Sequence, residues 1–392
     1  MSFESDFLQI MHRKLDEVLS MTEQVVNLDS GSYDQAGVNQ VQDVFAGALR
    51  EAGFEVSRKP LDGAGDQLTA RWRSGRPGSS VLILGHADTV WPKGTAAGWR
   101  FENSGELLTG PGVGDMKVSV VNAIIALREL IRTRDTGVAD ITFLIVPDEE
   151  IGSPQSGGWI QEEARNVDFC ITLEPARPNR GLVVGRGAVG HLSVEVTGVT
   201  AHVAHNRKEG VSAIAAAAQL VAPLEAISDA SRNLSVSIGL IRGGEARQIV
   251  PAIASFDADL RAAAIEDQRE LLEKIEARIA EASAAADPRI KITHKLIMRP
   301  PFAASAANQR MFALASSIAD EIGVKVHPLF SPGGSDACFA AAVGTPTLDG
   351  LGPITHEMCS RRERVEVHSI PTQGALLACL VRRAGRQGGH VS

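Results

Sequence analysis

Cysteine is scarce in this sequence of 392 residues, and no two cysteines form a CxxC pair. The four are Cys170, Cys338, Cys359 and Cys379. The pattern does not indicate a disulfide framework, and we expect buried, reduced thiols. Long apolar runs are missing as well. The longest are only as long as a strand, which is far short of a membrane span.

An excess of positive charge is also missing. The formal net charge is −8 and the pI is near 5.7, which gives no support for a nucleic-acid partner or an acidic membrane surface. The N-terminal stretch MSFESDFLQIMHRKLDEVL has the pattern of a charged amphipathic helix, without a basic segment followed by an apolar one. We therefore expect a cytoplasmic protein with no membrane partner and no nucleic-acid partner.

Helix and strand patterns alternate through the first half of the chain. Segments with helical spacing of apolar residues are separated by short β-branched runs that turn residues bound. This alternation is typical of an α/β layer structure with a largely parallel sheet. We predict helices over 6–28, 35–52 and 117–133, and strands over 54–59, 68–73, 80–85, 141–146 and 167–172.

The middle of the chain has a different order of elements. Between about Arg186 and about Pro301 the order is β-α-β-β-α-β, which is that of the ferredoxin-like motif. The α/β pattern then resumes, so we predict that this block is a second domain inserted into the first. The block has predicted strands over 192–197, 234–241, 253–261 and 289–296 and helices over 211–227 and 265–284. Helices over 308–322, 336–342 and 371–381 and strands over 324–329 and 346–348 follow it.

Acidic and imidazole residues recur just after the predicted strands of the first domain. The carboxyl ends of strands are where open α/β sheets place their ligand sites. These residues are His86 and Asp88 in GHADTV, Asp115 in TGPGVGDMK, Asp148, Glu149 and Glu150 in IVPDEEIGS, Glu174 in LEP, and His356 in GPITHE.

The three adjacent carboxylates of IVPDEEIGS destabilise one another unless something positive lies among them. Two histidines and three carboxylates can hold two zinc ions, with one carboxylate bridging ions about 3.5–4 Å apart. Each residue alone has an ordinary structural explanation, such as a turn, a helix cap or a solvated loop. Together they would require five independent coincidences at strand ends, which favours the metal site. The stretch TGPGVG lacks the GxGxxG spacing directly after an apolar strand, so it does not indicate a nucleotide site.

The motifs HADTV, GPGVGDMK, DEEIGS, LEP and GPITHE, in that order, resemble those of the co-catalytic zinc metallopeptidase and aminoacylase family. That family includes glutamate carboxypeptidase, acetylornithine deacetylase and succinyl-diaminopimelate desuccinylase. The resemblance covers essentially the whole chain. It implies a discontinuous α/β catalytic domain over 1–185 and 302–392 with a mostly parallel sheet. It also implies that the ferredoxin-like block, 186–301, is a lid through which two copies form a homodimer.

The resemblance further implies a role for each motif residue. Asp115 is expected to bridge two zinc ions, His86 and Glu174 to complete one site, and Glu150 and His356 to complete the other. Glu149 is expected to be the general base, and Asp88 to orient the imidazole of His86. The peptide bond after Asp115 is expected to be cis. Cobalt or manganese would also accept this ligand set.

The lid and one catalytic-domain loop are expected to contact the substrate. By resemblance, His202 rather than His205 reaches across the dimer to the oxyanion. Arg261, at the end of DADLR, matches an arginine that binds a substrate carboxylate, although a surface ion pair is the alternative. The loop SPGGSDA resembles a loop beside the substrate, where the N–H groups of Gly333 and Gly334 and the hydroxyl of Ser335 hold the carboxylate.

Three positions depart from the family pattern. Arg207 replaces a proline, Gln248 in ARQIVP replaces an asparagine at the substrate, and Glu363 comes later than the acid usually found four residues after the last histidine. Because these positions surround the substrate and not the metals, hydrolysis stays predicted while the exact substrate stays open.

Several motif variants favour the glutamate carboxypeptidase branch. We therefore predict a metal-dependent amide hydrolase that releases C-terminal Glu or Asp from an N-acyl amino acid or short peptide. An N-acyl-amino-acid deacylase for neutral or aromatic residues is the first alternative. A non-catalytic, metal-binding dimer is a more distant one.

Overall fold

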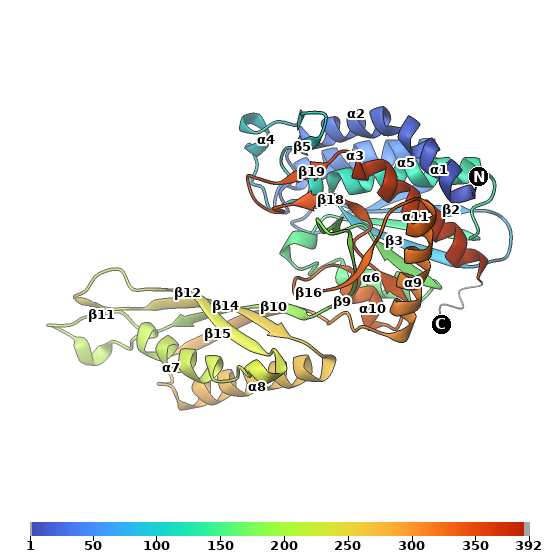
Figure 1. The fold of residues 1–392 in the computed structure, drawn as a ribbon. Coiled ribbons are helices and arrows are strands. Elements are labelled where there is room, and N and C mark those ends of the chain that lie inside the picture. Colours follow the sequence, from blue (N-terminus) through green and yellow to red (C-terminus); the bar gives the residue numbers. More distant parts are fainter. Residues whose placement is uncertain (1, 388–392) are drawn as a thin grey trace. The chain divides into compact units, whose positions relative to one another are not determined.

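A computed structural model of the chain describes residues 2–387, which form two compact units (Figure 1). The first unit holds the described residues up to Gly185, then Ala304–Ser331, then the described residues from Ser335 onward. The second holds Arg186–Ala303 with Pro332–Gly334. The predicted α/β class with an inserted second sheet is confirmed, while the exact domain limits inferred from the sequence stay a prediction.

A six-stranded sheet forms the centre of the first unit. Its three parallel pairings, β6–β3, β3–β7 and β7–β17, place several strand carboxyl ends at one edge. The pairings β1–β2 and β2–β6 are antiparallel, so the sheet is mixed. In spatial order the strands are β1 (Glu55–Lys59), β2 (Gln67–Arg73), β6 (Asp140–Val146), β3 (Ser80–His86), β7 (Phe169–Thr172) and β17 (Thr347–Leu348).

Helices cover both faces of this sheet. Side chains alternate along β3, where Val81 and Ile83 join the large core on one face while Leu82 and Leu84 join a smaller core on the other. The large core includes residues of α1 (Phe3–Arg13), α2 (Leu15–Val26), α3 (Gln35–Glu51), α5 (Val118–Arg132), α9 (Ala306–Glu321) and α11 (Ser369–Arg386). The smaller core includes residues of α6 (Gly157–Ala164) and α10 (Ala337–Ala342).

Short strands beside the main sheet bring distant segments of the chain together. The segment after β7 pairs with a segment near the C-terminus, because β8 (Pro175–Ala176) is parallel to β18 (Gly352–His356). The same sheet continues through β19 (Arg364–Glu366), β5 (Leu107–Thr109) and β4 (Glu102–Asn103). A separate pair joins β16 (His327–Ser331) to β9 (Gly181–Arg186), and α4 spans Thr95–Gly98.

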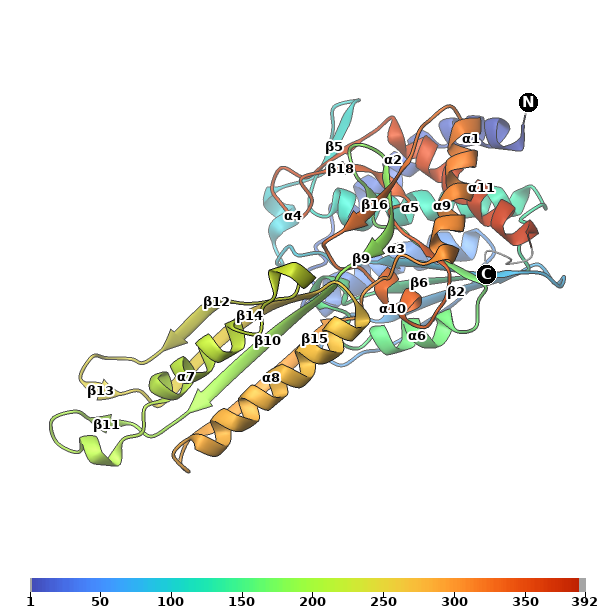
Figure 2. The same cartoon turned by 60° about the horizontal axis from the view of Figure 1, so that its bottom comes forward.

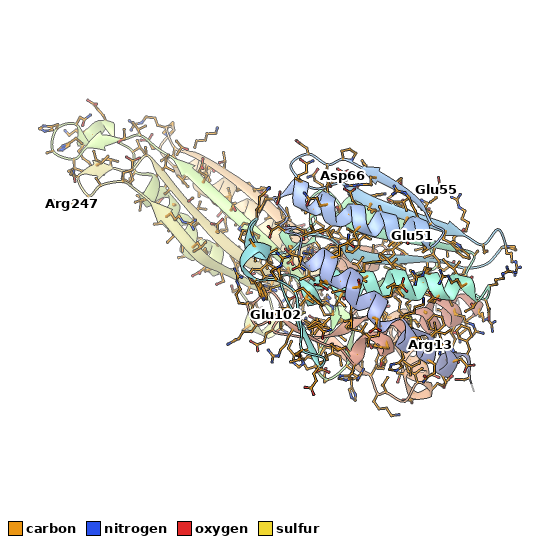
Figure 3. The ribbon with its side chains drawn as sticks, turned by 90° about the horizontal axis from the view of Figure 1, so that it is seen from above. Arg13, Glu51, Glu55, Asp66, Glu102 and Arg247 are labelled. Atoms are coloured by element: carbon orange, nitrogen blue, oxygen red, sulfur yellow. The ribbon has the colours of Figure 1, made fainter. Side chains whose placement is uncertain are left out.

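The second unit is an antiparallel sheet with two helices on one face (Figure 2). Its elements follow the predicted β-α-β-β-α-β order. They are β10 (Ala188–Thr197), α7 (Ala213–Glu225), β12 (Ser235–Gly243), β14 (Ile253–Ala262), α8 (Ile265–Ala285) and β15 (Lys291–Arg299), with the spatial order β12-β14-β10-β15. A short ladder joins β11 (Ala201–His202) to β13 (Ile249–Val250), and Arg247 lies in the loop between β12 and β13 (Figure 3).

Several predicted elements differ from the structure. The strand expected over 192–197 begins earlier, at Ala188, and the helix expected over 371–381 continues to Arg386. The helix expected over 6–28 is divided at Lys14 into α1 and α2. The strand expected over 324–329 begins instead at His327, because the segment from Val324 continues the turn after α9, with the Val324 N–H donating to Ala319. None of the helices within residues 2–387 combines the length and apolar character that a membrane crossing needs.

Candidate metal centre

His86 ends β3 and is buried, with 1% of its surface exposed. Its Nδ1 lies 2.9 Å from the main-chain oxygen of Asp88, and its Nε2 lies 3.2 Å from Oδ1 of Asp115. A carbonyl oxygen can only accept, so Nδ1 carries a proton, and Nε2 faces a carboxylate oxygen of Asp115 that has no proton of its own to donate when ionised. Nε2 of His86 and Oδ1 of Asp115 can therefore lie 3.2 Å apart with either a proton on Nε2 or a metal cation bound by both atoms.

The loop that carries Asp115 is closely packed. Gly112 has a φ of +67°, and a Cβ added to Gly114 would lie 2.2 Å from Thr355, so neither position suits a larger residue. The Asp115–Met116 peptide bond is cis, as the family resemblance implied. The loop therefore places the Asp115 carboxylate beside His86.

Asp88 connects the two loops that follow β3 and β6. Its carboxylate is fully buried and accepts the main-chain N–H groups of Glu149 at 3.2 Å and Glu150 at 3.1 Å. It also accepts the hydroxyl of Ser32 at 2.7 Å. Its main-chain oxygen is the nearer partner of the His86 ring. One residue thus fixes His86 and the pair of glutamates together.

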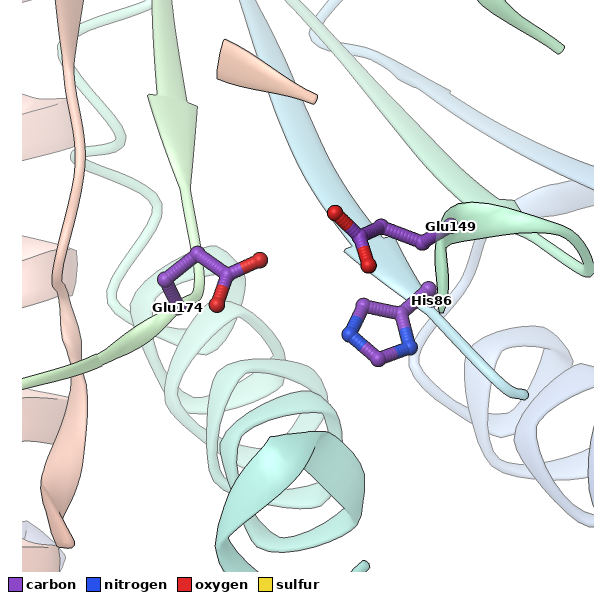
Figure 4. A group of neighbouring side chains, drawn as sticks. All are labelled: His86, Glu149 and Glu174. Carbon is purple, nitrogen blue, oxygen red and sulfur yellow. The ribbon is translucent and has the colours of Figure 1, made fainter. Parts of the chain in front are cut away.

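Two groups of side chains have ligand atoms that all lie within 4.8 Å of one another. One group is His86, Glu149 and Glu174, which come from the ends of β3, β6 and β7 (Figure 4). The other group is His86, Asp115 and Glu150. The structure therefore brings together the side chains of five of the predicted site residues.

The charges of this cluster are unbalanced. Burial raises the pKa of Glu150 well above its usual value, and the charge of Asp115 raises it further. The same two causes raise the pKa of Glu174. Burial opposes a charge on His86, but its hydrogen bonds with Asp115 and Asp88 outweigh burial and raise its pKa. Oε1 of Glu150 is buried, and residues 2–387 provide it with no hydrogen-bond partner. This donor set fits divalent metal ions, which supply the missing positive charge.

His356 is the predicted ligand that these two groups do not include. It ends β18, and its Nε2 lies 2.7 Å from Oε1 of Glu366 on β19. A carboxylate on one ring nitrogen is the usual arrangement of a metal-bound histidine, whose other nitrogen then faces the metal. Its role as a ligand stays a prediction.

His202 and Gln248 lie in the second unit. His202 is on β11, its ring centroid is 4.6 Å from that of His205, and its Nδ1 accepts the N–H of Ala204 at 3.2 Å. Gln248 is exposed, and its main-chain oxygen accepts the N–H of Val203 at 3.0 Å. Nothing in this unit by itself tests the roles expected for either residue.

Arg261 is engaged within its own unit. Its guanidinium forms two hydrogen bonds with the carboxylate of Asp259, at 2.7 and 2.8 Å, and a third with the main-chain oxygen of Pro332 at 3.0 Å. The two residues are two apart on β14, so both side chains lie on the same face of the strand. The carboxylate of Asp259 therefore accepts the guanidinium N–H groups that a substrate carboxylate would need.

The SPGGSDA loop divides between the two units. The main-chain oxygens of Gly333 and Gly334 accept hydrogen bonds from the Arg186 guanidinium at 2.9 and 3.2 Å. Ser335 is fully buried and donates its hydroxyl to Asp349 at 2.9 Å. This hydroxyl is therefore used inside the first unit, and carboxylate binding by the loop stays a prediction.

Glu363 supports the loop of a proposed metal ligand, so the expectation that it lies around the substrate and not at the metals was wrong. Its carboxylate is 1% exposed and accepts the N–H groups of Gly114 at 2.8 Å, Asp115 at 3.3 Å and Cys359 at 3.1 Å. Burial raises its pKa to about 7, and the charge of Asp115 adds to the rise. The only signal in the sequence was the late acid after His356, because the contact joins residues about 250 positions apart.

Comparisons with known proteins agree with the motif pattern. Residues 82–383 match the family described as Peptidase family M20/M25/M40. Carboxypeptidase G2 of Pseudomonas sp. (strain RS-16) is 30% identical over 94% of this chain and 89% of its own length.

Solved structures share the fold. An M20 family metallo-carboxypeptidase from Sulfolobus solfataricus superposes with a TM-score of 0.75, at 13% identity over 93% of this chain and 98% of its own. A dinuclear metal-binding peptidase of the M20 family from Bacillus subtilis gives a TM-score of 0.65, at 15% identity over 95% and 99% of the two chains.

Proposed function

This chain belongs to peptidase family M20/M25/M40, and we propose that within that family it releases a C-terminal acidic amino acid from an N-acyl or peptidyl substrate. The chain is a metallohydrolase of amide bonds, which agrees with the motif resemblance. Its similarity to carboxypeptidase G2 supports a carboxypeptidase-type reaction. The identity of the released residue rests on the sequence motifs.

The observation that supports the proposal most strongly is the cluster of buried and partly buried carboxylates around His86. Asp115, Glu150 and Glu174 lie there with too little positive charge around them. We propose that two zinc ions bind in this cluster, or cobalt or manganese in their place, with Asp115 shared between them. His86 and Glu174 would hold one ion, and Glu150 and His356 the other. When bound, such ions polarise a carbonyl group and lower the pKa of water.

The protein groups then supply binding and proton transfer. Glu149 takes a proton from the attacking water and passes it to the nitrogen of the leaving amine, as a general base and then a general acid. Asp88 keeps Nδ1 of His86 protonated through its main-chain oxygen and fixes the main chain of Glu149 through its carboxylate. A shift of the His86 ring or of the Glu149 main chain would misalign the atoms between which the proton moves.

The second unit contributes proposals of its own. His202 would donate to the oxyanion from the partner subunit of a homodimer formed through residues 186–301. Arg261 would bind a substrate carboxylate in place of Asp259, with Gln248, Gly333, Gly334 and Ser335 as further substrate contacts. These roles, the dimer and the cytoplasmic location all stay predictions.

A comparison of Glu149→Gln with wild type tests the proposal. Zinc-loaded proteins are incubated with N-acyl-Glu and N-acyl-Phe, and released amine is detected with ninhydrin. The variant should keep its bound metal and lose roughly a hundredfold or more in kcat, because the amide cannot accept the proton. Glu55→Gln is the matched control, since Glu55 is an exposed residue at the start of β1 (Figure 3).

The two substrates of the same assay, N-acyl-Glu and N-acyl-Phe, distinguish the proposed carboxypeptidase from the alternative deacylase. Preferential release of Glu supports the carboxypeptidase proposal, whereas preferential release of Phe replaces it with a deacylase for neutral or aromatic residues. A metal-loaded, folded protein that releases no amine from either substrate would contradict the proposed activity and favour a non-catalytic metal-binding dimer.

A further inference from the structure

A cavity of about 490 Å³ in the first unit lies directly beside the candidate metal centre. Glu150 and Ile151 form part of its wall, and the loops that follow α2 and β3 form the rest. The volume is within the roughly 300–1,000 Å³ typical of small-molecule pockets. A group bound in this cavity would therefore lie next to the residues of the proposed reaction.

The walls of the cavity concentrate aromatic side chains that are rare in this chain. The sequence has one tyrosine and four tryptophans, and the cavity is lined by Tyr33 and Trp91. Val90 and Pro92 add apolar surface. Tyr33 is 82% exposed, so its ring contributes little to the core. An exposed ring at the mouth of an apolar cavity is suited to covering an apolar ligand.

Trp91 is held in place by its neighbours. Its ring meets that of Trp99 edge-on, with centroids 5.0 Å apart and planes at 85°. The guanidinium of Arg361 lies 5.1 Å from the centroids of both rings, within the range of a cation–π contact. These contacts restrict the orientation of the Trp91 ring, which lowers the entropy that this side chain loses when a ligand binds.

The cavity is also fixed to the catalytic residues. The N–H of Thr89 donates to the main-chain oxygen of Ser30 at 2.8 Å and joins the two lining loops. The hydroxyl of Ser32, in the cavity wall, donates to Asp88, which accepts the N–H of Glu150. A short chain of hydrogen bonds thus sets the distance between the cavity and the metal ligands.

The charges of the cavity decide which part of a substrate fits. Lys93 is the cation among the lining residues, and its Nζ lies 3.3 Å from Oδ1 of Asp34. Glu150 adds a second carboxylate. An acidic amino acid placed here would meet carboxylates and an already paired lysine, so the acidic leaving group does not suit this wall.

We infer that this cavity binds the acyl side of the substrate and selects bulky apolar acyl groups, with Tyr33 covering the group and Trp91 supporting it. The inference rests on the proposed amide hydrolysis, because it places the scissile bond at the adjacent metal centre. It assigns to Tyr33 and Trp91 a role in substrate choice that the metal-site motifs do not contain.

The test compares three substrates with wild type, Tyr33→Ala and Tyr33→Phe in zinc-loaded form. N-benzoyl-Glu and N-acetyl-Glu share the leaving group and differ in acyl bulk, and N-acetyl-Phe moves the aromatic ring to the leaving side. Wild type should favour the benzoyl substrate in kcat/KM. Tyr33→Ala should lower the benzoyl-to-acetyl ratio about tenfold through KM, whereas Tyr33→Phe should keep it, because the ring makes the contact.

Calorimetric binding of benzoate and acetate gives a readout that does not depend on turnover. Tyr33→Ala should weaken benzoate binding by a similar factor. An unchanged benzoyl-to-acetyl ratio in Tyr33→Ala, with N-acetyl-Glu hydrolysed, would overturn the inference and leave the proposed function intact. A Tyr33 effect confined to N-acetyl-Phe would also overturn it, because the cavity would then hold the leaving residue. Failure of wild type to cleave any of the three substrates would contradict the proposed function itself.

Discussion

Replacing Glu363 with alanine removes a buried carboxylate that joins the Asp115 loop to the segment after His356. The carboxylate accepts three main-chain N–H groups, those of Gly114, Asp115 and Cys359, at 2.8, 3.3 and 3.1 Å. Each main-chain N–H group that loses its acceptor costs roughly 1–3 kcal/mol when it stays shielded from water. Gly114 is buried and Cys359 is more exposed, so we expect a total loss of about 3 kcal/mol in the free energy of unfolding.

Glutamine at the same position should cost less. Its carbonyl oxygen can still accept the N–H groups of Gly114 and Asp115. Its NH₂ group faces the N–H of Cys359, and two donors cannot form a hydrogen bond. We expect Glu363→Gln to lose about 1–2 kcal/mol. Because Asp115 is a proposed ligand, both variants should also bind zinc more weakly, by roughly 10–100-fold as for other residues that support metal ligands.

Urea unfolding of the metal-free proteins at pH 5 measures the first effect, because the buried Glu363 carboxyl is protonated below its pKa of about 7 and no buried charge offsets the lost hydrogen bonds. Competition with a chelating dye measures the second. Glu102→Ala, at an exposed site on β4, is the matched control (Figure 3). A loss below about 1 kcal/mol in Glu363→Ala, where three hydrogen bonds predict about 3, would refute the reasoning.

Two further predictions concern charge. Glu150→Gln should raise the unfolding free energy of the metal-free protein by about 1 kcal/mol, because wild type must either bury this charge among carboxylates or take up a proton when it folds. The variant should also show a smaller thermal shift on adding zinc. A metal-free variant that is less stable than wild type would contradict the claim that the carboxylates around His86 lack compensating positive charge. Glu17 has its pKa lowered to about 2 by hydrogen bonding to Arg128. Because the folded pKa lies below the unfolded value, its contribution is full at pH 6 and is lost as the pH falls from about 5 toward 2. The pair is partly exposed, so urea unfolding of Glu17→Gln should show a loss of only about 0.5–1 kcal/mol at pH 6 and a smaller loss at pH 3. An equal loss at both pH values would show that the ion pair is not its source.

Much of the first unit follows from the sequence because its signals are local. The apolar run that becomes β6 is followed directly by three carboxylates, and parallel pairing brings its end beside that of β3. Side-chain alternation along β14 similarly predicts a sheet with one covered face in the second unit. Motif resemblance added the cis peptide bond after Asp115, which no periodicity indicates.

The remaining features depend on contacts between distant residues. The division of the first helix at Lys14 has no glycine or proline to mark it. Glu363 reaches the Asp115 loop only because β18 and β19 form an antiparallel pair next to it. The pairing of Arg261 with Asp259 is different, since a two-residue spacing on a strand places both on one face and was visible in DADLR.

The central claim is that the buried and partly buried carboxylates around His86 hold metal ions that this chain needs to cleave an amide bond. The most direct test strips the protein with a chelator, returns zinc in measured amounts, and follows both bound metal and Glu release from an N-acyl-Glu substrate. The account predicts that release disappears on stripping and returns in proportion to zinc, up to two ions per chain. Release that continues at the original rate in the stripped protein would contradict it.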